Sequence, residues 1–502
     1  MAAFTNLVDL AQERLGGSVV YANDEFFAPK DNLLKAAKPI FKEGEFTDRG
    51  KWMDGWETRR RRTPGHDFCI VRLGAPGIVR GVVIDTAHFK GNFPQHASID
   101  ACAMHGNPDI EQLLAPSMRW IEILPQVGLV GDAPNGFPID SRYRVTHLRL
   151  HIYPDGGVAR LRVHGDVLAD PRLFTRGEVD LAAVENGASV VLCNDMFFGS
   201  RLNLTMPGFA ANMGDGWETK RSRSAGPDWA IVRLATAGTI ERIEVDTAHF
   251  KGNAPESCAI QVAYAPTASD ATAGEITEWH DLLRRTKLQP HTRHLFEREI
   301  VAHAQVTHAR LQIFPDGGVS RLRLFGRASQ DGRERAGLAR LNALFQLDLL
   351  RELRGCCASD AWALGVGEQR PYASMAQLVA CADRVWSTLP REAWREAFRG
   401  HPRIGERAPS NAPESARRWS EEEQSSVSKS GLELRVAIDR RNRDYEAKFG
   451  HIFLICATGK RADQVLSALD ERMSNDADTE LQIAAEEHRK IVHLRLAKLV
   501  SG

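Results

Sequence analysis

An internal duplication constrains the fold of this chain more than any other feature of its sequence. Residues 85–92 read Asp-Thr-Ala-His-Phe-Lys-Gly-Asn, and the same eight residues return at 246–253. Asn-Asp-x-Phe-Phe, Gly-Trp-Glu-Thr and Pro-Asp-Gly-Gly-Val are also repeated in the same order. Because the copies lie about 160 residues apart, each repeat is too long for a solenoid unit and has the size of a domain. The sequence therefore predicts two homologous domains, at 1–167 and 168–328.

Each copy has the residue pattern of a β domain. Leu148, Leu150 and Ile152 alternate with polar residues, which is typical of a half-buried strand. Pro-Asp-Gly-Gly then provides turn residues, so we expect a hairpin whose second strand runs from Val158 to Val163. Other short apolar runs are bounded by Gly, Pro and Thr, and many short strands of this kind indicate a β-sandwich in each copy.

The pattern changes after the second copy. Residues 327–337 are polar and show no periodicity, which predicts a linker. Beyond it, apolar residues recur at steps of three and four, most clearly over 375–386 and 478–499, as on one face of a helix. We therefore expect a third, all-α domain at 337–502.

Charge and cysteine content exclude several classes of protein. The 65 Lys and Arg residues balance the 65 Asp and Glu residues, so there is no basic excess for binding nucleic acid. No apolar run approaches the roughly 18 residues of a membrane span, and the N-terminus lacks the pattern of a signal peptide. The eight cysteines form no Cys-x-x-Cys pair, which favours reduced thiols in the cytoplasm. No dense cluster of His, Asp or Glu indicates a metal site, so we predict none.

A basic cluster follows each Gly-Trp-Glu-Thr motif, at 59–62 and at 220–223. With a net charge of zero, these clusters favour a small carboxylate ligand, which a planar guanidinium group binds through two hydrogen bonds. A second interpretation stays open, because exposed indole rings at Trp56 and Trp217 would suit a sugar. The repeated eight-residue motif also suits a structural corner, and the two domains would then bind a ligand without catalysis.

The four repeated motifs resemble those of allantoicase, over roughly residues 16–327. The resemblance implies two galactose-binding-like jelly-roll domains and the hydrolysis of allantoate to ureidoglycolate and urea. A carboxylate or imidazole would transfer protons to the leaving urea nitrogen, while Lys and Arg hold the substrate carboxylate. The catalytic residues that we infer from this resemblance are Glu57, His88 and Lys90 in the first copy and Glu218, His249 and Lys251 in the second.

Motifs in the third domain have ordinary structural interpretations when each is taken alone. A histidine before a proline, at His401, favours the end of a helix. Ser420 and Glu423 have the spacing of a capping box at a helix start. Glu487 and Arg495 lie on one face of the last predicted helix, where solvated ion pairs are common.

Taken together and in order, these motifs resemble 2-oxo-4-hydroxy-4-carboxy-5-ureidoimidazoline (OHCU) decarboxylase, which produces (S)-allantoin. The resemblance covers about residues 337–499 and includes Cys-Cys-x-Ser, His-Pro-Arg-Ile-Gly, Glu-Gln and Phe-Gly. It implies that His401, Glu423 and Arg495 are catalytic. It also implies a pocket formed by Pro402, Ser420, Gln424 and the backbone of Ile455, Cys456, Ala457, Thr458 and Gly459.

The implied decarboxylation needs no cofactor, because the substrate's own ring C=N accepts the electrons left by CO₂. His401 would deliver a proton to one face, with its imidazole held by Glu423, and Arg495 would bind a carboxylate or carbonyl. The sequence departs from the family pattern at His451 and Ile452, where Phe and Pro are expected. We expect His451 to lie at the surface.

The sequence thus predicts a bifunctional purine-catabolic enzyme in the cytoplasm, acting on two small molecules without nucleic acid or membrane partners. We expect a homo-oligomer. The alternative is a decarboxylase that carries a non-catalytic jelly-roll module for ligand binding.

Overall fold

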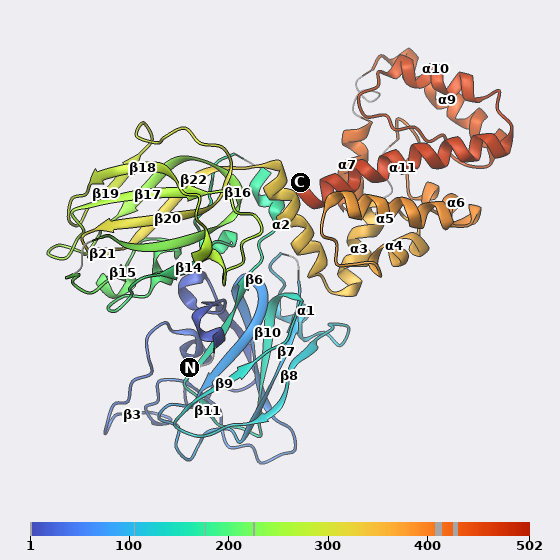
Figure 1. Cartoon of the computed structure of the whole chain (residues 1–502). Helices are drawn as coiled ribbons and strands as arrows, with labels where there is room; N and C mark the ends of the chain where they lie inside the picture. Colours follow the sequence, from blue (N-terminus) through green and yellow to red (C-terminus); the bar gives the residue numbers. More distant parts are fainter. Residues whose placement is uncertain (1–2, 105, 176, 224–225, 407–413, 425–429) are drawn as a thin grey trace. The chain divides into compact units, whose positions relative to one another are not determined.

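The computed structural model of the protein describes residues 3–104, 106–175, 177–223, 226–406, 414–424 and 430–502. Its contacts divide the chain into two compact units, Met1–Ala336 and Gly337–Gly502. The first unit contains two β domains of the same topology, and the second is helical (Figure 1). The predicted fold class is confirmed, since two eight-stranded antiparallel β-sandwiches precede a helical domain.

One long strand, β6, organises the first repeat. The eight strands of this sheet are β1 (Val8–Asp9), β2 (Ser18–Ala22), β6 (Asp67–Asp85), β7 (His96–Cys102), β8 (Ile121–Gly128), β9 (Pro134–Pro138), β10 (Arg144–Tyr153) and β12 (Arg160–Val167). The first half of β6 pairs with β2 and β10, and its second half pairs with β9 and β12. Gly77 lies between the halves, where an added β-carbon would come within 2.3 Å of the Asp166 carbonyl oxygen. Only glycine allows this close approach of two backbones.

The hairpin predicted around Pro-Asp-Gly-Gly is wrong. Strands β10 and β12 do not pair with each other but lie on opposite sides of β6, in the order β1-β12-β6-β10-β7-β8. The turn instead leads into β11 (Gly157–Val158), which pairs with β5 (Trp56–Glu57). Two of the repeated motifs are thereby joined by backbone hydrogen bonds, and this pairing helps to build the candidate site described below.

The second repeat copies this arrangement around β16. Its eight strands are β13 (Val179–Asp180), β14 (Ser189–Cys193), β16 (Asp228–Asp246), β17 (Ser257–Ala263), β18 (His280–Lys287), β19 (Arg293–Phe296), β20 (Val306–Phe314) and β22 (Arg321–Ala328). The small pair β15 (Trp217–Glu218) and β21 (Gly318–Val319) corresponds to β5 and β11. The first repeat also contains the short hairpin β3 (Phe46–Thr47) and β4 (Gly50–Lys51), and the short helix α1 (Ile110–Leu114). In both repeats the alternate apolar residues of these strands are buried, so each sandwich has its own core.

The predicted linker is largely a helix, α2 (Gln330–Asn342), which begins directly after β22. The Ser329 hydroxyl accepts a hydrogen bond from the backbone N–H of Gly332, which caps the first turn. Asp331 and Arg335, one turn apart, form an ion pair on its surface. Polar composition therefore misled the prediction, because a helix with capping and surface pairs needs few apolar residues.

The helical unit is organised around its long last helix. Its helices after α2 are α3 (Gln346–Cys356), α4 (Asp360–Gly367), α5 (Met375–Thr388), α6 (Arg391–Arg399), α7 (Glu414–Glu423), α9 (Leu432–Phe449), α10 (Ala462–Arg472) and α11 (Ala477–Ser501). Buried apolar residues of α11 pack against α3 and α5, and α4 packs against these two helices in the same core. Ile438, Tyr445, Val465 and Leu469 form a second core between α9 and α10. Among the helices that the structure describes, none is long and apolar enough to span a membrane.

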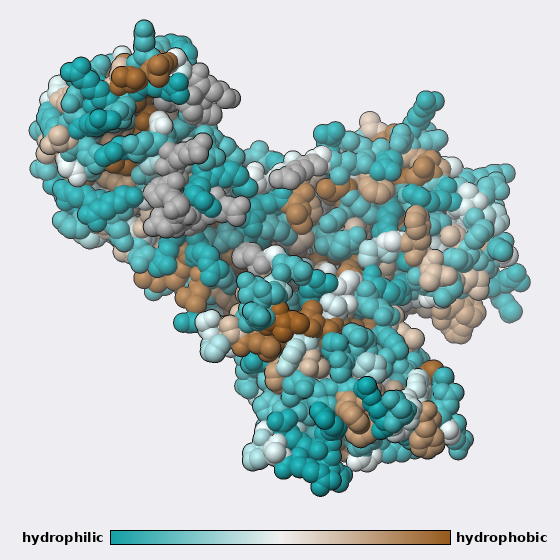
Figure 2. Space-filling view, turned by 180° about the vertical axis from the view of Figure 1, so that it is seen from behind, coloured by the Kyte–Doolittle hydropathy of each residue, from teal (hydrophilic) through white to brown (hydrophobic). Residues whose placement is uncertain are grey.

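The surface is mostly polar on the face shown in Figure 2, with apolar side chains in several groups of different size. Such exposure is ordinary for a globular protein and needs no ligand to explain it.

Candidate active sites

The helical unit places His401 just beyond α6. The backbone N–H of His401 still donates to the Phe398 carbonyl at 3.0 Å, and the proline that follows prevents further helix. The imidazole is 9% exposed and stands edge-to-face against His488 of α11, with ring centroids 5.0 Å apart. Burial, and then the positive charge of Arg495, hold the pKa of His401 well below its usual value. The imidazole of His401 is therefore neutral at neutral pH.

Arg495 and Glu423 form a two-pronged ion pair between α11 and α7. The Arg495 Nε and Nη2 atoms donate to the two carboxylate oxygens at 3.0 and 2.8 Å, and Nη2 also donates to the Ser420 hydroxyl at 2.9 Å. The capping-box prediction is wrong, since Ser420 lies in the last turn of α7 and not at a helix start. Its spacing to Glu423 instead brings both side chains to one guanidinium group.

The expected His401–Glu423 pair is not formed among the described residues. Both carboxylate oxygens of Glu423 already accept hydrogen bonds from Arg495, and the ring next to His401 is that of His488. Glu423 therefore orients Arg495, and packing rather than a carboxylate fixes the imidazole plane of His401.

His401 and Glu423 line a small cavity, whereas Arg495 and Ser420 lie behind Glu423 and are not among the residues that line it. The cavity is lined by His401, Pro402, Ile404, Glu423, Gln424, Phe453, Leu454, Ile455, Ala457, Thr458 and Ile491. Most of the expected pocket residues are among them. Cys456 instead turns its N–H to Glu487, and Gly459 lies in the turn closed by the bond from Lys460 N to Ala457 O. Gln424 helps to shape the opposite side, because its Oε1 accepts the backbone N–H of Gly405 at 2.7 Å.

His451 is buried, contrary to the expected surface position. Its ring lies 5.5 Å from Phe398 and 5.7 Å from Tyr445, measured between ring centroids. Its Nδ1 lies 3.0 Å from the carbonyl oxygen of Ile452, and burial lowers the pKa of the imidazole. His451 thus fills the space between aromatic side chains as a neutral ring.

In the first β repeat, all four repeated motifs converge on Glu57. The pairing of β5 with β11 sets Glu57 opposite Gly157, and Glu57 Oε1 accepts a hydrogen bond from Asn92 Nδ2 at 2.7 Å. The adjacent Trp56 donates its indole N–H to the Asp24 carbonyl. Burial raises the pKa of Glu57, and the Asn92 amide partly opposes this. The second repeat has the same contacts, with Asn253 donating to Glu218 at 2.5 Å.

His88 and His249 adopt the same unusual backbone conformation. Their φ angles are 70° and 69°, in the left-handed region that non-glycine residues rarely occupy. The Nε2 atom of His88 lies 3.3 Å from the Pro39 carbonyl, and that of His249 lies 2.9 Å from the Ala210 carbonyl. Since a carbonyl accepts only, Nε2 is the donor in each contact, and Nδ1 is the ring nitrogen left for another partner. Backbone strain of this kind is common at active sites.

The two repeats differ beside these histidines. In the first, Asp132 accepts the His88 backbone N–H at 2.7 Å, and its other oxygen lies 3.8 Å from Lys90 Nζ. In the second, the backbone N–H of His249 donates to His291 Nδ1 at 2.7 Å. An imidazole therefore accepts the histidine N–H in the second repeat, where a carboxylate close to Lys90 accepts it in the first.

Comparison with known proteins gives the same division of the chain. The model of the family described as allantoicase repeat matches residues 8–168 and 179–329. The chain belongs to the allantoicase family. The model described as OHCU decarboxylase matches residues 342–497, so a decarboxylase domain follows the two allantoicase repeats. Both resemblances stated from the sequence motifs are confirmed.

Individual relatives of the allantoicase repeats support that part of the assignment. A probable allantoicase of Pseudomonas aeruginosa (strain UCBPP-PA14) is 52% identical over 328 residues, which cover 65% of this chain and 97% of that protein. A probable allantoicase of Streptomyces coelicolor is 45% identical over 66% of this chain and 88% of that protein. The crystal structure of allantoicase from Saccharomyces cerevisiae is 37% identical with a TM-score of 0.54, and covers 64% of this chain and 92% of that one. A crystal structure of OHCU decarboxylase in the presence of (S)-allantoin is 32% identical with a TM-score of 0.27. The match covers 30% of this chain and 99% of that one.

The geometry removes the basis for a sugar platform in the allantoicase repeats. Trp56 and Trp217 are both fully buried, so neither presents an indole face to a ligand. The first basic residue after each Gly-Trp-Glu-Thr motif pairs with the aspartate of the Asn-Asp motif, through Arg59 and Lys220. Within the described ranges, no group of three or more His, Cys, Asp or Glu side chains is placed to hold a metal ion.

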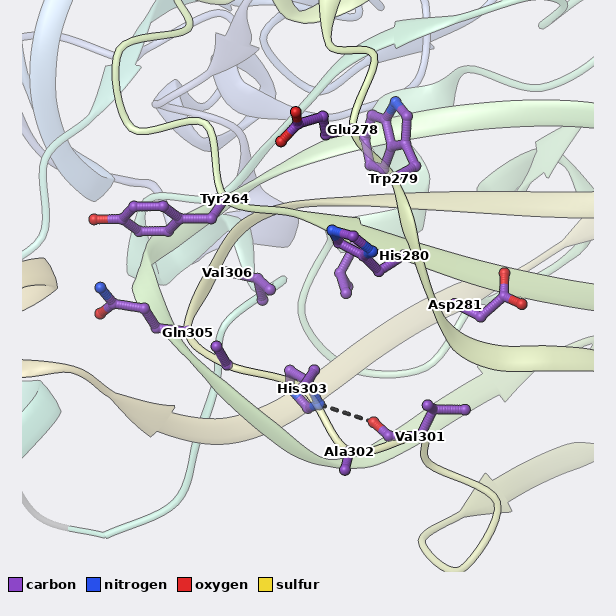
Figure 3. A pocket seen from close by; sticks show the side chains of 12 residues that line it. Tyr264, Glu278, Trp279, His280, Asp281, Val301, Ala302, His303, Gln305 and Val306 are labelled. Carbon is purple, nitrogen blue, oxygen red and sulfur yellow. Dashed lines mark hydrogen bonds between the residues drawn. The ribbon is translucent and has the colours of Figure 1, made fainter.

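An open cavity of about 770 Å³ lies elsewhere on the second repeat (Figure 3). Tyr264, Trp279, His280 and His303 are among its lining residues, and none of the expected site residues is. Its polar groups mostly hold the structure together, since His303 Nε2 accepts the Ile240 backbone N–H and its Nδ1 lies 3.1 Å from the Val301 carbonyl oxygen.

Sequence reasoning missed several residues that shape the sites. Asn92 and Asn253 end the repeated motif, so their repetition was a usable signal. His488 gave no signal, because a histidine within a helical pattern becomes informative only when its neighbours are known. Glu487 was noted, but as part of a solvated surface, whereas its side chain is only 15% exposed.

Proposed function

We propose that this chain is a bifunctional enzyme of purine catabolism. Its allantoicase repeats hydrolyse allantoate to ureidoglycolate and urea, and its helical domain decarboxylates OHCU to (S)-allantoin. The observation that carries the proposal is the match of the two family models to the β repeats and to the helical domain, where His401, Glu423 and Gln424 line one cavity.

The decarboxylase reaction needs an anion site and one well-placed proton. The bond from ring carbon to carboxylate breaks, its electron pair passes to the ring C=N, and a proton then adds to one face of that carbon. His401 is neutral in the empty site, and a bound carboxylate raises the pKa of an adjacent imidazole. Binding of the substrate carboxylate thus favours protonation of His401, and His401 then delivers this proton to the ring carbon. Arg495, held by Glu423, provides the fixed positive charge that binds the substrate.

The allantoicase reaction needs a base for water and an acid for the leaving group. Water attacks the central carbon, the C–N bond to one ureido group breaks, and the departing nitrogen takes a proton to give urea. The Nδ1 atom of His88 is the proposed base, and Glu57, whose raised pKa favours its acid form, is the proposed acid. Lys90 and the adjacent basic cluster would hold the substrate carboxylate. Equivalent roles in the second repeat fall to His249, Glu218 and Lys251.

We place this activity in the cytoplasm, because all eight cysteines are free thiols. A homo-oligomeric state remains a prediction.

The test is to measure both reactions with the same purified full-length chain. Urea release from allantoate and formation of (S)-allantoin from OHCU are followed with and without EDTA. Release of urea that survives chelation supports the side-chain mechanism above, and release that EDTA abolishes keeps the reaction but overturns that mechanism. Decarboxylation without urea release would favour the alternative, in which the repeats only bind a ligand.

A further inference from the structure

One side of the decarboxylase cavity is a segment without regular secondary structure. Residues 453–458, which we call the wall segment, run between α9 and α10 and supply several of the cavity-lining side chains. A segment of this kind has no helix or sheet to hold its backbone. Its position therefore depends on contacts with neighbouring elements.

Two charged side chains hold the backbone of the wall segment. Arg472 of α10 donates from Nη1 to the Leu454 carbonyl at 2.7 Å, and Glu487 of α11 accepts the Cys456 N–H through Oε2 at 2.8 Å. A hydrogen bond to an ionised group is shorter and about twice as strong as a neutral one. The wall segment is thus fixed at two points only two residues apart.

The contact at Arg472 belongs to the core of the domain. Arg472 pairs with the fully buried Glu480, which also accepts from the Tyr445 hydroxyl. Removing any one of these partners would leave a buried charge or hydroxyl without its partner and would destabilise the whole domain. A variant of Arg472 therefore cannot distinguish a role in the site from a role in folding.

The contact at Glu487 is different, because it joins the wall segment directly to the helix that bears the catalytic arginine. Glu487, Ile491 and Arg495 follow one another at intervals of four residues on α11. Ile491 lines the cavity and Arg495 binds Glu423, so successive turns of one helix face hold the wall segment, the cavity and the ion pair. The second oxygen of Glu487 accepts from Lys490 Nζ at 2.6 Å, and this contact helps to orient the carboxylate.

We propose that Glu487 is a positioning residue of the decarboxylase site. By accepting the Cys456 N–H, it fixes the wall segment so that Ile455 and Ala457, on either side of Cys456, meet the substrate in the correct place. The role is indirect, and it rests on the proposed decarboxylase function. A displacement of about 1 Å in a pocket wall is sufficient to cost on the order of 10²-fold in rate.

The experiment compares three variants of the full-length chain. Glu487→Leu removes the acceptor, Glu487→Gln retains an oxygen that can accept the same N–H, and Glu486→Leu is the matched control. Glu486 is the neighbouring residue of the same type, and it pairs with Arg489 instead of the wall segment. We expect Glu487→Leu to lower kcat/KM for decarboxylation about 10- to 100-fold. We expect kcat/KM for decarboxylation in Glu487→Gln and Glu486→Leu to stay within about threefold of that of the unchanged chain. All three variants should release urea from allantoate at the rate of the unchanged chain.

Hydrogen exchange of the Cys456 amide is the second readout. It should accelerate in Glu487→Leu and stay unchanged in Glu487→Gln and Glu486→Leu, because only the first loses the acceptor. Faster exchange with undiminished decarboxylation overturns the positioning role, and so does an equal loss of activity in Glu487→Gln. If the unchanged chain does not decarboxylate OHCU, the proposed function fails, and the exchange data alone then show whether Glu487 holds the wall segment.

Discussion

The decarboxylase domain and the allantoicase repeats place their chemical groups in opposite environments. Arg495, Glu423 and His401 are almost fully buried, and their charges and hydrogen bonds depend on one another. Lys90 is 79% exposed, and Glu57 is only half-buried at the end of its sandwich. In the decarboxylase domain, packing controls protonation, so changes there affect activity and folding together. In the repeats, single side chains can be changed with little effect on stability.

The largest effect is expected at the proposed proton donor of the buried site. His401→Ala should lower the rate of (S)-allantoin formation by about 10²- to 10⁴-fold, the usual contribution of a proton-transfer group. Urea release by the same preparation serves as the control and should not change. A decarboxylation rate within threefold of the unchanged chain would remove His401 from the mechanism.

The next effect tests the coupling of charge and folding in the decarboxylase domain. Arg495→Met leaves Glu423 buried without its cation, and losing one member of a buried pair typically costs about 3–5 kcal/mol. Calorimetry of the full chain should show a lower unfolding temperature for one transition only. Adding Glu423→Gln to the same chain removes the stranded charge and should restore part of the loss. If the single variant unfolds at the original temperature, the pair does not stabilise the domain.

A smaller effect is expected from single changes in the repeats, and it would show whether one repeat or both hydrolyse allantoate. Burial raises the pKa of Glu57, so its acid form persists to higher pH and is lost as the pH rises through that value. Glu57→Gln should lower urea release by the first repeat at least about tenfold and remove that repeat's alkaline fall, so the whole chain keeps about half of its rate if the second repeat is also active. Glu218→Gln is the matched change, at the carboxylate that Asn253 holds in the same way. Equal losses in the two variants would indicate that both repeats are active.

The smallest expected effect concerns the buried imidazole behind His401. Burial lowers the pKa of His488 to about 3, against about 6.5 in an unfolded chain. Between these values the unfolded state binds more protons, so stability falls as the pH drops, by at most about 1.4 kcal/mol per pH unit. His488→Phe keeps the stacking on Trp386 but cannot titrate. The decarboxylase transition should then depend less on pH between 5 and 7.5 than in the unchanged chain, and an identical dependence would contradict this account.

The sequence was most informative where the evidence was local or repeated. Duplicated motifs identified two β domains, and apolar periodicity identified the helices through Met375–Thr388 and Ala477–Ser501. It also singled out His401, Glu423 and Gln424, which the structure brings to one cavity. It failed at the predicted hairpin, because strand pairing is decided by residues far apart in the chain. It failed at His451 and Ser420 because neither burial nor a tertiary partner follows from neighbouring residues.

By itself, the sequence determined that the first two domains share one fold and that a helical domain follows them, because identical motifs repeat identical local contacts. It also determined which side chains are available for chemistry. Only the tertiary structure decided that Glu423 binds Arg495 instead of His401, and that Glu487 holds the wall segment. Protonation and hydrogen bonding depend on burial and on groups brought together from distant segments, and folding alone creates these conditions.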